Sequence, residues 1–553
     1  MKLQLIAASV AAALCLAPSP APAQTKIRLI NQDAPGVGLN DPRPQLPLGG
    51  NPGRTLGQQR QITFQYAADL WAALLGNVPE IRVSASFSPL ACSKGYVVLG
   101  AASAASVVAE DRVASGGAVD SYYAVALANA VAGRDFDVAG NHIDSEFNAR
   151  VDDVDCQELG ANGWFYGLHG NSPDNPEFRS NFLNVVMHEI GHGLGFYSLG
   201  VGTNLFDSPY GAMAWSNDSS KSYNDFERGE KALAVAIANP GRSVWKGEKA
   251  TATAALLAEN KTLFKITSPQ PALHEFRGAS FGPQDRSAMK GEIVLVDDEV
   301  LPDGRVLHTG CDGAEGQPKI RNRDDLVGKV ALVERGGCET GRKVLNVQNL
   351  GAVGVIVAND IPLDALPAGA GGSFRPQIKV PVITVTQEVG VALRSTVPVV
   401  ATGFVVDKTQ FNGLDAAGRV KLYTPRLFAA GSTLSHIDPE MSPDAIMEAI
   451  EARGMRADVS IGMVLDMMEE MGWPTNRNGT AKLGNCDTGI PVYKDGFIPG
   501  ANLIAHNNMC KTAFVGSRAQ QLRCMNDQIN WLHDQTLLSS AEVVKARQCV
   551  AKL

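Results

Sequence analysis

Several features are absent from this sequence, and each absence argues against one kind of anchor, site or partner. After residue 23 no run of 18 uninterrupted apolar residues occurs, so we predict no transmembrane anchor. The chain contains no Cys-x-x-Cys pair, which argues against a cysteine zinc site. Positive charge is not in excess: the formal net charge is −8 over 553 residues, which argues against nucleic acid as a partner. Hydrophobic residues make up 45% of the chain, enough for ordinary globular cores in several domains.

The N-terminus is typical of an export signal. Lys2 precedes an apolar run from Leu5 to Leu16, and residues 21–23 read Ala-Pro-Ala. We predict cleavage after Ala23 and a secreted or extracytoplasmic protein, with periplasmic and extracellular destinations both open.

The cysteines fall in even groups. Beyond Cys15 there are eight: Cys92 and Cys156, then Cys311 and Cys338, then Cys486, Cys510, Cys524 and Cys549. In an exported chain this grouping predicts one disulfide in each of the first two groups and two in the last. Free buried thiols are the alternative.

Residues 188–192 read His-Glu-Ile-Gly-His within an apolar run. If this run is helical, His188 and His192 leave one face one turn apart and can share a metal ion. A zinc ion held by imidazoles lowers the pKa of a water towards ~7, and a neighbouring carboxylate, Glu189, can take the proton. The pattern therefore predicts zinc-dependent amide hydrolysis.

The third ligand is not adjacent. In the common arrangement H-E-x-x-H-x-x-G-x-x-H, Gly195 matches the glycine, but Ser198 occupies the position of the last histidine. Two candidates remain downstream: His436, which we favour, or the carboxylates Glu227 and Glu230.

The spacing resembles one family. The relevant features are residues 188–196, a long insertion after them, Ser435-His436 and then a methionine. This arrangement is similar to the leishmanolysin-like metzincins, in which an inserted segment displaces the third zinc histidine. The resemblance implies the zinc ligands His188, His192 and His436, with Glu189 as general base.

A methionine turn beneath the metal is also implied by this resemblance. Met447 is the favoured residue for it and Met441 the competing one, because Glu448 and Ala449 depart from the small-then-proline ending often seen after that methionine. Plain core filling is the other interpretation of a methionine here.

The insertion has its own pattern. Between residues 262 and 403, short β-branched runs such as 291–296, 328–333 and 353–358 accompany one helical stretch near 343–349. This indicates a small β-rich domain with its own core, similar to the protease-associated (PA) domain of secreted and vacuolar peptidases. Such a domain is non-catalytic, so we expect it to shape access or recognition; a generic insertion is the alternative.

The expected fold class is α+β, a metzincin-like catalytic domain interrupted by the PA-like domain. Residues 24–58 are expected to form an extended lead-in, 64–75 a helix, and 81–87 and 122–127 strands. An edge strand ahead of the helix with the two histidines is where an extended peptide could add, and the sequence does not identify which strand is the edge. A helix is expected from Ser460 to Met471. The predicted segments are a signal peptide 1–23, catalytic parts 24–261 and 404–475, the insertion 262–403, and a disulfide-stapled appendage 476–553.

Two classes of function follow. The first is a secreted zinc endopeptidase acting on proteins or peptides, with His436 completing the site. The second is a catalytically idle adhesion or binding protein that keeps zinc for folding. Glu189 favours the first, because an idle site does not require a carboxylate there. The sequence does not specify the preferred substrate, the activation mechanism or the oligomeric state.

Overall fold

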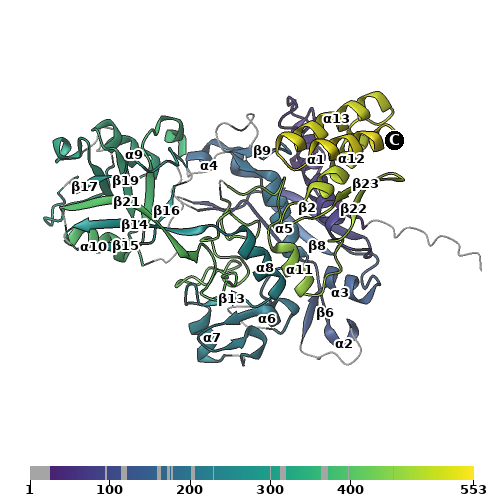
Figure 1. The fold of residues 1–553 in the computed structure, drawn as a ribbon, viewed down its shortest axis with the longest axis horizontal. Coiled ribbons are helices and arrows are strands. Elements are labelled where there is room, and N and C mark those ends of the chain that lie inside the picture. The colour runs from purple at the N-terminus through teal and green to yellow at the C-terminus, as the bar shows by residue number, and fades with distance from the viewer. Residues whose placement is uncertain are drawn as a thin grey trace, which may run out of the picture.

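The computed structural model describes residues 25–93, 96–113, 121–158, 163–170, 175, 179–200, 206–227, 229–268, 270–279, 281–298, 300–311, 319–362, 372–396, 398–452 and 454–553. The predicted export signal, residues 1–23, lies outside them. The chain forms a mixed α/β structure with a larger body and a second body that projects from it on two long strands (Figure 1).

A four-stranded sheet organises the larger body. Its order is β1 (Ile27–Asn31), β2 (Ile81–Ser88), β8 (Ile143–Asn148) and β5 (Gly100–Ala104). The first three strands run parallel, whereas β5 is antiparallel to β8 and forms one edge. The strand expected at 81–87 is therefore confirmed. The expected lead-in is corrected, because alternating Ile27 and Leu29 let its first residues join the sheet.

Two helices pack beside this sheet. α1 (Leu56–Leu74) begins after Thr55, whose hydroxyl accepts a hydrogen bond from Gln58 N at 3.2 Å, so the helix expected at 64–75 is confirmed and starts earlier. α5 (Phe182–Gly193) begins after Asn181, whose side chain caps Leu183 N at 3.0 Å. The indole of Trp71 in α1 donates to the carbonyl of Met187 in α5 at 3.0 Å, which fixes the two helices together.

The strand expected at 122–127 is only half correct. β7 (Tyr122–Ala124) pairs with β6 (Val107–Ala109), but α3 (Val125–Ala132) follows immediately. Alanine is the strongest helix former, and four alanines fall within α3.

The remaining elements of this part are short: β3 (Cys92–Ser93), β4 (Tyr96–Val97), α2 (Glu110–Val113), α4 (Val154–Glu158), β9 (Trp164–Phe165), β10 (Ser180–Asn181), α6 (Pro209–Met213), β11 (Ala214–Ser216), β12 (Lys221–Ser222), α7 (Lys231–Ala236), β13 (Ser243–Trp245) and α8 (Glu248–Leu257).

The projecting body is built on an eight-stranded sheet of order β15-β14-β21-β17-β18-β19-β20-β16. Its strands are β14 (Asn260–Ser268), β15 (Ala272–His274), β16 (Arg277–Gly278), β17 (Gly291–Leu295), β18 (Val330–Glu334), β19 (Gly354–Ala358), β20 (Val382–Val385) and β21 (Val399–Phe411). Separate apolar clusters, one around Val333 and Val355 and one around Leu332 and Ile356, fill its two faces, so this body has its own core.

Two helices accompany that sheet instead of the one expected. α9 (Thr340–Asn349) matches the predicted helical stretch. α10 (Gln387–Ser395) was not predicted; Thr386 caps it by accepting a hydrogen bond from Val389 N at 3.3 Å.

After β21 the chain returns to the larger body. Residues 412–463 consist mainly of turns and single bridges, and α11 (Val464–Glu470) is a shorter form of the helix expected from Ser460 to Met471. The C-terminal region follows as β22 (Thr480–Leu483), β23 (Cys486–Pro491), α12 (Pro499–Ala513), α13 (Arg518–Asp534) and α14 (Ser540–Val550).

The C-terminal region is part of the main core and not an appendage. α12 lies along α1 (Figure 1), and Tyr66 in α1 donates a hydrogen bond to Asn502 in α12 at 2.6 Å. One continuous apolar cluster contains residues of both helices, including Trp71 and Leu503. The sequence pattern could not reveal this, because amphipathic helices do not specify which surface they cover.

Four disulfides are present: Cys92–Cys156, Cys311–Cys338, Cys486–Cys549 and Cys510–Cys524. The pairing expected from the even grouping is confirmed. Among the described residues, no helix has both the length and the apolar character needed to cross a membrane.

Candidate metal centre

Three histidines from distant parts of the chain meet at one point. His188 and His192 lie one turn apart on α5, and His436 lies in the turns after β21. Their Nε2 atoms are separated by 3.0 Å (188 to 192), 3.1 Å (192 to 436) and 3.3 Å (436 to 188). Among the described residues this is the one group of three or more His, Cys, Asp and Glu side chains arranged to hold a metal ion.

Each imidazole is oriented by a backbone carbonyl on its other nitrogen. The Nδ1 atoms of His188, His192 and His436 lie 2.7, 2.7 and 2.9 Å from the carbonyl oxygens of Ile446, Phe196 and Ser432. A carbonyl oxygen only accepts, so each Nδ1 carries the hydrogen and each Nε2 presents a lone pair. Carbonyl partners of this kind commonly fix the tautomer of metal-binding histidines.

Three lone pairs that face one another in a buried site need a cation between them. Burial lowers the pKa of His188 to about 4 and that of His436 to about 3, which disfavours protons as the shared cation. Tetrahedral zinc with Zn–N bonds of about 2.0–2.1 Å places its nitrogen ligands roughly 3.3 Å apart, near the separations found here. The donor set therefore fits a zinc ion, with three protein ligands and a fourth position free for a substrate or water.

Glu189 lies beside the ligands on α5 but is not one of them. It is 5% exposed, and burial raises the pKa of its carboxyl to about 8, opposed by a hydrogen bond from the backbone of Ala102. A Cβ on Gly100 would lie 3.0 Å from the Oε1 atom of Glu189, so the edge strand β5 approaches this carboxyl closely. Neither Gly100 nor Ala102 was predicted from the sequence, where the run of small residues at 100–104 was the available signal.

The backbone of β5 has one open side. Residues 99, 101, 103 and 105 face β8, as the bonds from Asn148 N to Leu99 O and from Ala105 N to His142 O show. Residues 100, 102 and 104 therefore direct their N–H and C=O groups to the opposite side, towards Glu189. β5 pairs with no second strand among the described residues. β5 is thus an edge strand close to α5, and it was not among the strands predicted from the sequence.

Met447 lies against the face of α5 that carries the histidines. Its Sδ atom is 2.6 Å from the place that a Cβ on Gly191 would take, and its side chain is fully buried. The carbonyl of Met447 accepts a hydrogen bond from Ile437 N at 2.8 Å, next to His436. Met441, the competing residue, packs against Gly413.

The two alternative carboxylate ligands lie elsewhere. Glu230 forms an ion pair with Lys221 at 2.8 Å and accepts a hydrogen bond from Glu227 N at 3.0 Å. Neither carboxylate belongs to the histidine group.

Comparison with known families identifies one domain. Residues 289–393 match the PA domain, so the projecting body contains a PA domain. No curated protein matches the chain.

Solved structures overlap with this chain over limited segments. BSAP, a zinc aminopeptidase from Bacillus subtilis, aligns with 15% identity over 29% of this chain and 37% of its own, at a TM-score of 0.19. An aminopeptidase from Aneurinibacillus sp. strain AM-1 aligns with 24% identity over 27% of this chain and 32% of its own, at 0.18. The subtilisin-like protease Apa1 from Pseudoalteromonas sp. AS-11 aligns with 16% identity over 28% and 35%, at 0.18. The chain thus spans about a third of each of these solved chains, and TM-scores this low assign neither its fold nor its activity.

Proposed function

We propose that this protein is a secreted zinc-dependent endopeptidase of the leishmanolysin-like metzincin type, with a PA domain inserted between its second and third zinc ligands. The observation that carries the proposal is the convergence of three lone-pair-bearing Nε2 atoms, within 3.3 Å of one another, beside a buried glutamate. His188, His192 and His436 are the ligands, and Met447 is the methionine-turn residue.

When bound, zinc supplies a Lewis acid that polarises the scissile carbonyl and makes a water more acidic. A cation held by the three neutral histidines would favour the ionised form of their neighbour Glu189, against the effect of burial on its pKa. The Glu189 carboxylate then accepts a proton from the attacking water, whose oxygen bonds to the carbonyl carbon. It returns that proton to the amide nitrogen as the C–N bond breaks.

The open side of β5 is the observation that favours a peptide or protein as the substrate. Its outward backbone groups lie beside Glu189, so an extended peptide can add to the sheet there and present one carbonyl to the site. Small side chains at Gly100, Ala102 and Ala104 leave room for that approach.

The alternative function is an idle binding protein with a structural zinc. The buried Glu189 argues against it, since an isolated buried carboxyl costs stability and contributes nothing to metal ligation. The test is hydrolysis of casein by purified protein, with and without a chelator, together with zinc content per chain in wild type and His436→Ala. Chelator-sensitive cleavage and loss of zinc in the variant are expected. Zinc at full occupancy in His436→Ala would show that His436 is not the third ligand.

A further inference from the structure

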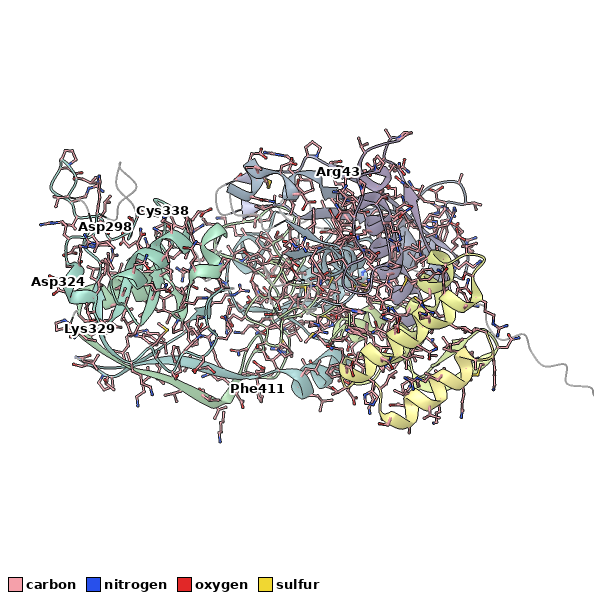
Figure 2. The ribbon with its side chains drawn as sticks, turned by 90° about the horizontal axis from the view of Figure 1, so that it is seen from above. Arg43, Asp298, Asp324, Lys329, Cys338 and Phe411 are labelled. Carbon is pink, nitrogen blue, oxygen red and sulfur yellow. A yellow bond between two sulfur atoms is a disulfide. The ribbon has the colours of Figure 1, made fainter. Side chains whose placement is uncertain are left out.

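The projecting body is joined to the larger body by a stalk of two antiparallel strands, β14 and β21. Figure 2 shows Phe411 where β21 reaches the larger body and Lys329 at the far end of the projecting body. At the root of the stalk, Asn412 N donates to the carbonyl of Glu259 at 2.9 Å, which closes the two strands together. Residues 259–261 and 411–413 form the root of this stalk.

This root contacts the segment that carries the third histidine. We name residues 436–448, which run from His436 to just past Met447, the ligand loop. Glu259 N donates to the carbonyl of Ser442 at 2.8 Å, and Ser442 Oγ donates to the Glu259 carboxylate at 2.6 Å. Gly413 packs so closely that a Cβ there would lie 2.5 Å from the Cα atom of Met441. These contacts tie Met441 and Ser442 of the ligand loop to the root.

A partly buried ion-pair network joins the same two segments. Lys261 in β14 forms an ion pair with Glu275 of the projecting body and lies 3.9 Å from Glu440 of the ligand loop. Glu440 also pairs with Lys421 at 2.9 Å. The side chains of Lys261 and Lys421 are only 10% and 16% exposed, so solvent screens these charges less than it screens surface pairs.

The network lies a short distance from the metal ligand. Glu440 follows His436 by four residues, and the backbone of Lys421 accepts a hydrogen bond from Asp438 N at 3.0 Å. The carbonyl of His436 itself accepts from Tyr423 N at 2.9 Å. By contrast, the pair Arg426–Glu388, which also joins the two bodies, is about half exposed, so solvent screens its charges strongly.

We infer that Lys261 and Glu440 are positioning residues, which hold the ligand loop so that His436 stays on the metal, and that the root of the inserted domain thereby sets how tightly zinc is bound. The inference rests on the proposed metal site. Residues that orient metal ligands typically change metal affinity by 10- to 100-fold when they are replaced.

The test measures zinc release from the full-length protein into a colorimetric chelator. Glu440→Gln and Lys261→Met are expected to release zinc about tenfold faster than wild type. The double variant is expected to accelerate release by less than the product of the two single effects, because both substitutions remove the shared contact between Lys261 and Glu440. Lys261→Arg, which keeps the charge, is expected to restore slow release.

Lys329→Met is the matched control. It breaks the Lys329–Glu292 ion pair at the far end of the projecting body and is expected to leave the release rate unchanged (Figure 2). Cobalt-substituted protein supplies a second readout, since a displaced His436 alters the visible absorption of the metal, whereas a purely structural role does not. Wild-type release rates and spectra in Glu440→Gln and Lys261→Met would overturn the inference while leaving the proposed function intact. A wild-type protein that binds no zinc would instead refute the proposed function.

Discussion

The Sδ atom of Met447 fills the space that a side chain on Gly191 would occupy, 2.6 Å from the ideal Cβ position. Gly191 lies between the two helical histidines in sequence, so this contact joins the end of the ligand loop to the part of α5 that carries them. Glycine costs a helix interior about 1 kcal/mol relative to alanine, and the close approach of the thioether accounts for its presence here.

Gly191→Ala is expected to lower the free energy of unfolding by about 1–3 kcal/mol, because overpacking outweighs the gain in helix propensity. Urea unfolding of the zinc-loaded protein measures it. In a double-mutant cycle, Met447→Ala is expected to relieve the cost of Gly191→Ala. Strict additivity of the two changes would contradict the contact.

Glu189→Gln is expected to abolish most hydrolysis, with a loss of roughly 10²- to 10⁴-fold or more in kcat, while zinc content stays at the wild-type level. Glutamine keeps the shape and can still accept the hydrogen bond from the Ala102 backbone, but it cannot take a proton. Peptide cleavage and metal analysis are measured on the same preparation. Parallel loss of zinc would count against the general-base role.

The zinc-free protein is expected to lose stability as the pH falls from about 6.5 towards about 3. Burial holds the pKa of His188 at about 4 and that of His436 at about 3, below the unfolded value of about 6.5. The unfolded chain therefore binds more protons across this window, and His188 alone contributes on the order of 3 kcal/mol.

Urea unfolding of the chelator-treated, zinc-free protein between pH 7 and pH 4 measures how steeply the free energy of unfolding falls with pH. His188→Gln serves as the comparison, because it removes one titrating group and leaves other acid-sensitive groups in place. Equal slopes in both proteins would show that His188 is not buried in its neutral form.

Excision of residues 262–403, bridged by a short Gly/Ser linker, is expected to leave one zinc per chain and cleavage of small peptides. β14 and β21 pair along the stalk, with Lys265 opposite Gly403, so the cut ends are already close. Lys261 and Glu440 are both retained. If cleavage of folded protein substrates changes while cleavage of small peptides does not, the PA domain acts in substrate recognition. If the shortened protein binds no zinc, the PA domain is needed to form the metal site.

Replacement of both Cys510 and Cys524 by serine is expected to cost about 3 kcal/mol of stability, the usual effect for a closed loop of this size. Because α12 packs on α1, hydrogen exchange of α1 amides is expected to accelerate. Removal of Cys311–Cys338 is the control, since that disulfide lies in the projecting body and is expected to leave α1 exchange unchanged.

The sequence alone determined the local parts of the site. Histidines four residues apart on a capped helix must share a face, so His188, Glu189 and His192 could be assigned their places from periodicity. Even cysteine groups within separate segments restricted the disulfides sufficiently to predict the first two pairs. The same local logic located most of α1, β2 and the core strands of the PA domain, where β-branched runs are buried on both faces.

Tertiary structure decided what depends on contacts between distant segments. The approach of Ala102 to Glu189, the contact of Met447 with Gly191, and the packing of α12 on α1 each join residues whose own sequence patterns are compatible with many partners. The lead-in became a sheet strand because a parallel partner, β2, was available to satisfy its backbone. His436 was identified from a resemblance, and its position depends on the ligand loop held against the root of the inserted domain, since a single histidine in a turn has no periodicity that could place it.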